Sequence, residues 1–140
     1  MDFEKMMADL FADEDRARAM ARHLMELAQR DPGAAAREKD SLLAFLRGPM
    51  ERHMVYEETT MFPKLVEHGL EPEVDVAKKH HEGLRAEAKN LETATAPDAI
   101  ARTVFLAARL MLHHTNFEGD FIYPELSKEQ WRSLMLATEK

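Results

Sequence analysis

The fold is decided by the stretch His53-Met-Val-Tyr-Glu57-Glu-Thr-Thr-Met-Phe62-Pro63-Lys-Leu65. A second copy lies near the C-terminal end, as His114-Thr-Asn-Phe-Glu118-Gly-Asp-Phe-Ile-Tyr123-Pro124-Glu-Leu126. Each copy contains a histidine, a glutamate four residues later, and then an aromatic-Pro-x-Leu tail. On an α-helix, a histidine and a glutamate with this spacing lie one turn apart on the same face. Two such pairs in one short chain predict two halves of a metal site.

Length and composition limit the class of protein. With 140 residues, the chain is long enough to form one domain, residues 1–140, around a single core. Hydrophobic residues at 45% and charged residues at 32% are typical of a globular protein. The net charge of −7, with no basic cluster, argues against a nucleic-acid or anionic-membrane partner. The absence of cysteine excludes disulfides, thiolate metal ligands and cysteine nucleophiles.

The sequence also predicts the cellular location of the protein. Its start, Met-Asp-Phe-Glu-Lys, lacks the basic and apolar regions of a signal peptide. The most apolar run, from Val104 to Leu112, contains Arg109 and is too short to span a bilayer. We therefore expect a soluble, cytoplasmic protein. Its protein partner is unknown, and a monomer and a homodimer both remain open.

Hydrophobic periodicity predicts helices over residues 3–29 and 35–62, from Pro72 to the turn at 93–97, and over 98–122. Gly48-Pro49 predicts a kink or restart in the second helix, and Phe62-Pro63 is expected to end it. Ser127-Lys-Glu-Gln130 reads as a capping box that opens a short final helix. Because the main loops are short, neighbouring helices should be antiparallel. The predicted fold is an all-α, up-down-up-down four-helix bundle with a short C-terminal extra helix.

Helical phase selects the inward-facing residue on the third helix. His81 shares a face with Ala77 and Leu84, whereas His80 lies about 100° away. We therefore predict that His81 faces the core, with His80 as the alternative.

The same argument applies to the acidic run on the first helix. Apolar residues stand at matching offsets from Glu14, whereas the same offsets from Asp15 include Arg18, which cannot line a core. Glu14 is therefore the predicted inward acid, with Asp13 or Asp15 as alternatives. Together with the two motifs, the predicted metal ligands are Glu14, His53, Glu57, His81, His114 and Glu118.

Three imidazoles and three carboxylates inside an apolar bundle would be costly to bury without a partner. Metal coordination satisfies them, and mixed nitrogen and oxygen ligands on bundle helices are typical of di-iron and di-manganese sites. Six ligands are too many for one tetrahedral zinc with an open position. They suit two ions, with Glu57 and Glu118 as bridges.

The chain resembles the hemerythrin-like, HHE cation-binding family over roughly residues 10–126. The resemblance lies in the two His-x-x-x-Glu motifs with their aromatic-Pro tails and in the single His81. It implies a non-haem di-iron centre with an oxo or hydroxo bridge in a four-helix bundle. By that resemblance, His53, His81 and His114 would be terminal iron ligands, and Glu57 and Glu118 would bridge.

Two departures from the family pattern bear on function. Glu14 stands in place of a first-helix histidine, and Ala77 and Arg85 flank His81 where O2 carriers have a His-x-x-x-His pair. With three inward histidines instead of five, reversible O2 carriage is not favoured. The extra carboxylate makes the site harder and more anionic, which favours ferric iron, with Mn or Zn as alternatives.

The predicted function is a di-iron protein that senses or reacts with O2, peroxide or nitric oxide. An iron-binding, storage or donation module without catalysis is one alternative, and a bundle with a degenerate site is another. Whether the protein is an enzyme, with redox activity toward peroxide or nitric oxide, is left open.

Five further side chains have secondary roles. Glu58 and Asp120 are interpreted as solvent-facing acids, with a hydrogen bond to the ring of a ligand histidine as the alternative. Tyr123 is interpreted as a packing residue, with a role near a bound oxidant as the alternative. Met50 and Met111 stand one turn before the motif histidines and should line the pocket.

Overall fold

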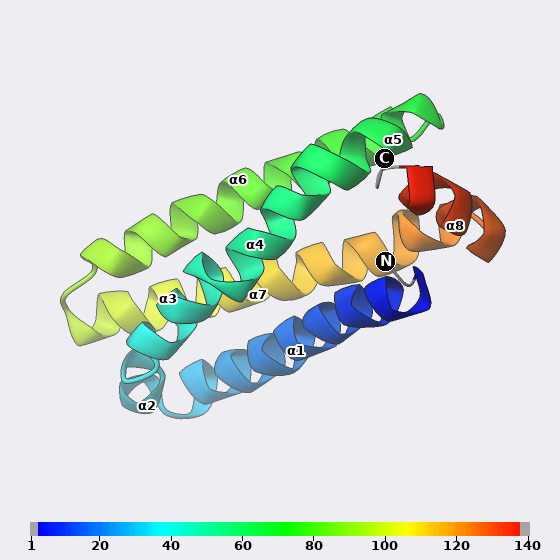
Figure 1. Ribbon diagram of the computed structural model, residues 1–140. Coiled ribbons are helices and arrows are strands. Elements are labelled where there is room, and N and C mark those ends of the chain that lie inside the picture. Colours follow the sequence, from blue (N-terminus) through cyan, green and yellow to red (C-terminus); the bar gives the residue numbers. More distant parts are fainter. Residues whose placement is uncertain (1–2, 138–140) are drawn as a thin grey trace.

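The structure, a computed structural model, describes residues 3–137 and contains no strand in that range. The predicted all-α class is therefore confirmed (Figure 1). In chain order the elements are α1 (Phe3–Arg30), α2 (Pro32–Ala36), α3 (Lys39–Arg47), α4 (Pro49–Tyr56), the π-helix η1 (Glu57–Met61), α5 (Phe62–Glu67), α6 (Glu71–Thr93), α7 (Pro97–Phe121), the 3₁₀ turn η2 (Tyr123–Glu125) and α8 (Lys128–Ala137).

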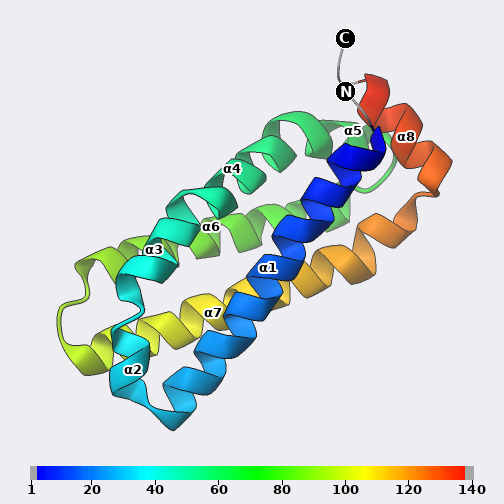
Figure 2. The ribbon, with the colours of Figure 1, turned by 60° about the horizontal axis from the view of Figure 1, so that its bottom comes forward.

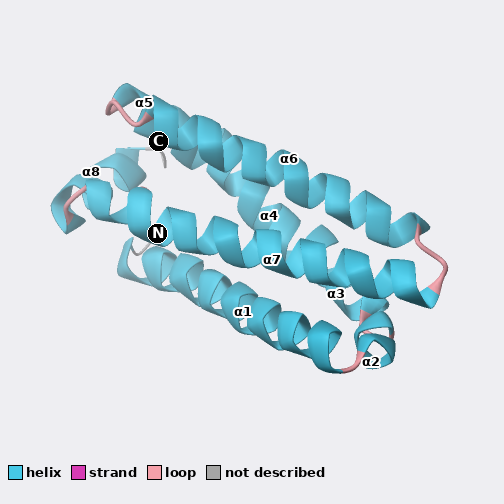
Figure 3. Cartoon of the chain, turned by 180° about the vertical axis from the view of Figure 1, so that it is seen from behind, coloured by secondary structure: helices cyan, strands magenta, loops and turns pink. Residues whose placement is uncertain are grey.

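The long elements pack along their lengths. Helix α7 contacts both α1 and α6, and α3 contacts α6. Figures 1 and 2 show the chain reversing direction between α1, the α3-to-α5 series, α6 and α7. The loops lie at the two ends of the molecule, as the view from behind makes clear (Figure 3). The connecting loops are therefore kept away from the middle of the molecule.

The predicted interruption at Gly48-Pro49 is confirmed. Helix α3 ends at Arg47, and Pro49 opens α4, where its missing N–H removes no helical hydrogen bond. A Cβ at Gly48 would lie 2.9 Å from the carbonyl oxygen of Ala44, so this close approach of backbone to backbone requires glycine.

The predicted helix end at Phe62-Pro63 is wrong, because the helical path continues through α5 to Glu67. The reason lies in η1, where the chain widens into a π-helix and the N–H of Phe62 bonds to the carbonyl of Glu57. In a regular α-helix, the ring of Pro63 would clash with the carbonyl four residues earlier. The wider turn shifts that carbonyl and lets the helix pass through the proline.

The capping box that opens the last helix is confirmed. The backbone N–H of Gln130 donates to Ser127 Oγ at 3.1 Å, and the N–H of Ser127 donates to Gln130 Oε1 at 2.8 Å. Helix α8 then buries Trp131 against η2, where its indole N–H donates to the carbonyl of Tyr123 at 2.9 Å.

The apolar core has two parts, one toward α2 and the other toward α8. On α1, Leu10 belongs to the second part and Ala17 to the first, with Glu14 between them. On α6, Ala77 and Leu84 stand on either side of His81 in the same way. The predicted polar residues therefore form a layer across the middle of the bundle, between two apolar layers. Within residues 3–137, no helix has the length and apolar character needed to cross a membrane.

Candidate metal centre

The structure brings all six predicted ligand residues together. They come from α1 (Glu14), α4 (His53), η1 (Glu57), α6 (His81) and α7 (His114 and Glu118). Every one of them is buried, with exposed fractions from 0% to 7%. The ligand atoms fall into two overlapping groups, and within each group they lie within 4.8 Å of one another.

The first group comprises Glu57, His81, His114 and Glu118. His81 Nε2 lies 3.2 Å from Glu57 Oε1, and His114 Nε2 lies 2.5 Å from Glu118 Oε1. The ring of His81 is stacked on Phe62, with centroids 5.5 Å apart, so an apolar wall closes this side.

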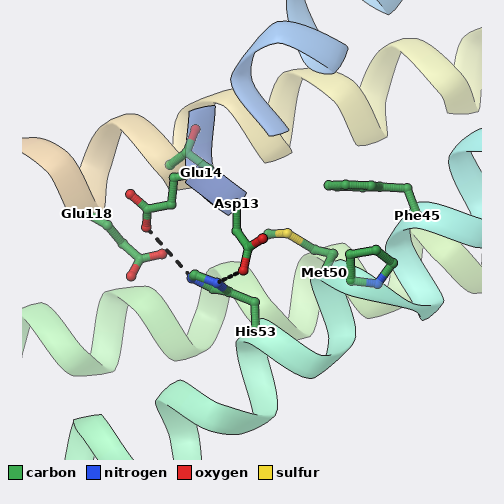
Figure 4. Close-up of a pocket in the computed structure, with 8 residues that line it drawn as sticks. Asp13, Glu14, Phe45, Met50, His53 and Glu118 are labelled. Carbon is green, nitrogen blue, oxygen red and sulfur yellow. Dashed lines mark ion pairs between the residues drawn. The ribbon is translucent and has the colours of Figure 1, made fainter. Parts of the chain in front are cut away.

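The second group comprises Glu14, His53, Glu57 and Glu118. His53 Nε2 lies 3.6 Å from Glu57 Oε2 and 3.8 Å from Glu14 Oε1. Figure 4 shows the side chains of Glu14, His53 and Glu118 pointing toward one another. Glu57 and Glu118 belong to both groups, which is the arrangement that two neighbouring ions with bridging carboxylates require.

The hydrogen bonds that these side chains make, or lack, show whether the residues fit a metal ion. Ten buried side-chain nitrogen and oxygen atoms within the described part of the chain lack a hydrogen-bond partner, and nine of them belong to these six residues. Buried polar atoms are normally hydrogen-bonded, because leaving one unpaired costs free energy. A cluster of imidazole nitrogens and carboxylate oxygens is also the donor set that iron, manganese and zinc accept. The residues therefore fit a metal site.

The electrostatics of the carboxylates point the same way. Burial and the neighbouring Glu118 raise the pKa of Glu14 from 4.5 to about 9 and hold that of Glu57 well above its usual range. Burial also opposes ionisation of Glu118, but the imidazoles of His114 and His53, with Glu57 as a hydrogen-bond partner, lower its pKa to about 2. Glu14 and Glu57 keep their protons because no positive charge nearby is sufficient to stabilise their ionised forms. A bound cation would supply that charge and would replace the protons.

The two alternative acids on α1, Asp13 and Asp15, lie outside this cluster. Asp15 is exposed and pairs with Arg18 at 2.8 Å. Asp13 has a side chain that is 41% exposed and places Oδ2 at 3.5 Å from Nδ1 of His53, on the ring nitrogen that faces away from Glu57. The guanidinium of Arg18 lies 3.4 Å from Glu14 Oε2 and leaves Oε1 directed at His53. Of the three acids, only Glu14 is buried among the predicted ligands.

The outer nitrogens of the other two histidines also have partners. His81 Nδ1 lies 2.6 Å from Glu58 Oε2, as the alternative interpretation of Glu58 predicted, whereas Asp120 is exposed. His114 Nδ1 lies 3.1 Å from Nδ1 of His80. From the sequence, His80 is predicted only as the alternative to His81. Its phase, 100° from His81, was the signal that it would face α7 instead.

Burial and the charge of nearby His114 lower the pKa of His81 to about 4. The imidazole is therefore neutral at pH 7 and has a free lone pair, as a metal ligand must. The pKa of His80 is likewise lowered to about 4, by burial and by His114.

Tyr123 interacts electrostatically with the ligand carboxyls in addition to packing in the core. Its phenol oxygen is buried and has no hydrogen-bond partner of ideal geometry among the described residues. It is nevertheless close enough to the carboxyl of Glu14 to lower the pKa of that group. Burial, together with the nearby Glu118 and Glu14 carboxylates, raises the pKa of Tyr123 well above 10. Its ring is held edge-on by Phe11 at 5.0 Å and lies 5.6 Å from Trp131.

Access to the centre lies on the side of α1 and α4. A small cavity of about 10 Å³ is lined by Glu14, Met50, His53 and Glu118, among others, and has room for roughly one water molecule. Figure 4 shows Met50 and Phe45 beside it. A wider surface cleft of about 500 Å³, which includes Arg16 and Arg52, shares Asp13, Pro49 and His53 with this cavity. His53 is therefore the ligand residue nearest to solvent.

An all-helical domain with two overlapping groups of buried histidines and carboxylates defines a cation-binding protein. The chain belongs to the hemerythrin family, because the family model described as hemerythrin HHE cation binding domain matches residues 6–104. This range includes Glu14, His53, Glu57 and His81, whereas His114 and Glu118 follow it. No match was found among curated proteins or among solved structures. The predicted family is thus confirmed.

Proposed function

We propose that this protein binds two iron ions and senses or reacts with O2, peroxide or nitric oxide at that centre. The observation that carries the proposal is the pair of ligand groups that share Glu57 and Glu118. A single ion would leave His53 and Glu14, or His81 and His114, buried without a partner. The proposal assumes the up-down-up-down four-helix bundle predicted from the sequence, in which each long segment contributes at least one ligand.

Each ligand residue has a defined role in this proposal. His81 and His114 would hold one ion and His53 and Glu14 the other, while Glu57 and Glu118 would be shared by the two. When bound, the iron pair supplies electron exchange with a small molecule. The chain itself contributes imidazole nitrogens, a carboxylate in place of one more imidazole, and exclusion of bulk water by the apolar layers on either side.

The size of the cavity limits the ligand class. Because the space beside Glu14 and His53 is close to that of one water molecule, a diatomic molecule or peroxide is favoured over an organic substrate. The carboxylate at position 14 favours the ferric state, which supports reaction or sensing over reversible O2 carriage.

Metal analysis tests the proposal. Apoprotein loaded with Fe(II) without oxygen and then exposed to air should retain two Fe per chain and show near-ultraviolet and visible bands that change with azide or peroxide. His53→Ala and His114→Ala should each lower the iron content, whereas His23→Ala, an exposed histidine on α1, should not. Wild-type protein that retains no iron after such loading would refute the proposal.

Iron storage or donation without catalysis uses the same ligands and is supported by the surface cleft that reaches His53, through which iron would enter and leave. The two functions are separated by turnover. A storage module should release its iron to a chelator within minutes and should not consume peroxide, whereas a reactive centre should consume peroxide while its iron is retained.

A further inference from the structure

The strongest set of contacts outside the six ligand residues surrounds Arg85. Its Nη1 and Nη2 donate to the carboxylate of Glu58 at 2.8 and 3.0 Å. Its Nε and Nη2 donate to both oxygens of Glu51, at 2.8 to 3.1 Å. Arg85 thus joins α6 to α4 and η1 through two carboxylates. Paired, planar contacts of this kind fix a carboxylate in position and orientation.

One of these carboxylates reaches the centre. Glu58 Oε2 accepts the Nδ1–H of His81 at 2.6 Å, and His81 Nε2 faces Glu57. The proton of the neutral ring is therefore on Nδ1, and the lone pair of Nε2 is directed at the metal position. An ionised acceptor on the outer nitrogen makes a histidine a stronger electron donor to a metal.

Arg85 acts in the opposite sense. It stands one helical turn after His81 and cannot itself be a ligand, because a guanidinium keeps its proton. Its guanidinium donates to both oxygens of Glu58, so it competes with the Nδ1–H of His81 for the negative charge of that carboxylate. The side chains of Glu58 and Arg85 are only 25% and 36% exposed, so solvent screens this arrangement incompletely.

We propose that Glu58 and Arg85 are positioning residues that together set the donor strength of His81, with Glu58 increasing it and Arg85 limiting it. This inference rests on the proposed function in one respect, namely that His81 binds a metal. It adds a tuning device that lies outside the ligand residues and that predicts opposite effects when its two members are changed.

The first test is metal affinity. Glu58→Gln keeps the size of the side chain but offers His81 a neutral partner, so we expect Co(II) to bind 10- to 100-fold more weakly, measured by competition with a chelator. Glu51→Gln is the matched control, because Glu51 contacts the same guanidinium and does not contact His81. It should change the affinity less than threefold. Equal losses in the two variants would overturn the proposal.

The second test is the reduction potential of the iron-loaded protein. Glu58→Gln removes negative charge from His81 and should raise the potential, whereas Arg85→Gln leaves Glu58 a stronger base and should lower it. Arg85→Lys keeps the charge without the planar contacts and should lie between wild type and Arg85→Gln. It also serves if Arg85→Gln does not fold. Shifts in the same direction for the glutamate and arginine variants would indicate mere loosening of the site and overturn the inference. Failure of wild-type protein to bind either metal would instead contradict the proposed function.

Discussion

Glu14 shows how far a single residue can be predicted. Helical phase favours it over Asp15, because the same offsets from Asp15 would turn Arg18 into the core, while phase leaves Asp13 as an alternative. The structure places Glu14 at 3% exposure and Asp15 on the surface. Its role as a ligand remains a proposal, as does its replacement of the first-helix histidine that the family resemblance implies.

Replacement of that acid gives a direct prediction. Glu14→His should leave the fold intact and shift the visible bands of the iron-loaded protein, because a neutral nitrogen donor replaces a charged oxygen donor. Asp15→His is the control, since Asp15 is exposed on the same turn of α1 and should leave the spectrum as in wild type. Identical spectra for Glu14→His and wild-type protein would place Glu14 outside the metal site.

The protons of the metal-free centre predict a pH dependence of stability. The pKa of Glu14 is about 9 in the folded chain and 4.5 ordinarily, so the folded state binds more protons than the unfolded state between these values. The stability contributed by this group is complete below pH 4.5 and is lost as pH rises toward 9. His80 and His81, with pKa values lowered from 6.5 to about 4, have the opposite effect, but only below pH 6.5.

Above pH 6.5 the carboxyls therefore dominate. The free energy of unfolding of chelator-treated protein should fall between pH 6.5 and 9, by at most about 1.4 kcal/mol per pH unit for each protonated carboxyl. Urea titrations at several pH values measure this. Loading with metal should abolish the decline, because the cation replaces the protons. A flat profile for the metal-free protein would show that Glu14 is not protonated there.

At the scale of the helical element, the sequence predicted faces better than ends. Leu42, Leu46 and Met50 are buried as their spacing requires, and Gly48-Pro49 interrupts the helix where expected. The end at Phe62-Pro63 failed because a rule for α-helices was applied to a segment that is not one. Nothing in the letters Glu57-Glu-Thr-Thr-Met61 distinguishes a π-helix from an α-helix. The contacts of Glu58 with His81 and Arg85 could not be predicted from the sequence either, since they depend on how α4 and α6 are placed against each other.

The π-helix gives a prediction of its own. Deletion of Thr59, which is exposed in η1, should convert this segment to a regular α-helix. Pro63 would then fall within an ordinary helix and cost about 3 kcal/mol, seen as a lower midpoint in thermal unfolding. Adding Pro63→Ala to the deletion should recover most of that loss. If the deletion alone has no effect on the midpoint, the wider turn is not what accommodates the proline.

At the scale of the whole molecule, the polar layer interrupts an otherwise continuous core. Without metal, this layer places nine buried atoms without hydrogen bonds in the middle of the bundle. We therefore expect His53→Ala and His114→Ala to leave the thermal midpoint of the metal-free protein unchanged or raised. The same variants should lose the stabilisation that metal gives to wild type, which is about 4 kcal/mol at 1,000 times the dissociation constant. Differential scanning calorimetry with and without metal measures both effects.

Glu57 and Glu118, the two carboxylates common to both ligand groups, have a consequence for the order in which the protein takes up metal ions. In the proposed two-ion centre, the first ion would fix Glu57 and Glu118 in place and displace the proton of Glu57, so the second ion would meet a position already assembled. Half-filled chains should therefore be scarce. At one equivalent of metal, native mass spectrometry should find mainly empty chains and chains with two ions, and a cell short of iron would hold some fully competent molecules rather than many incomplete ones.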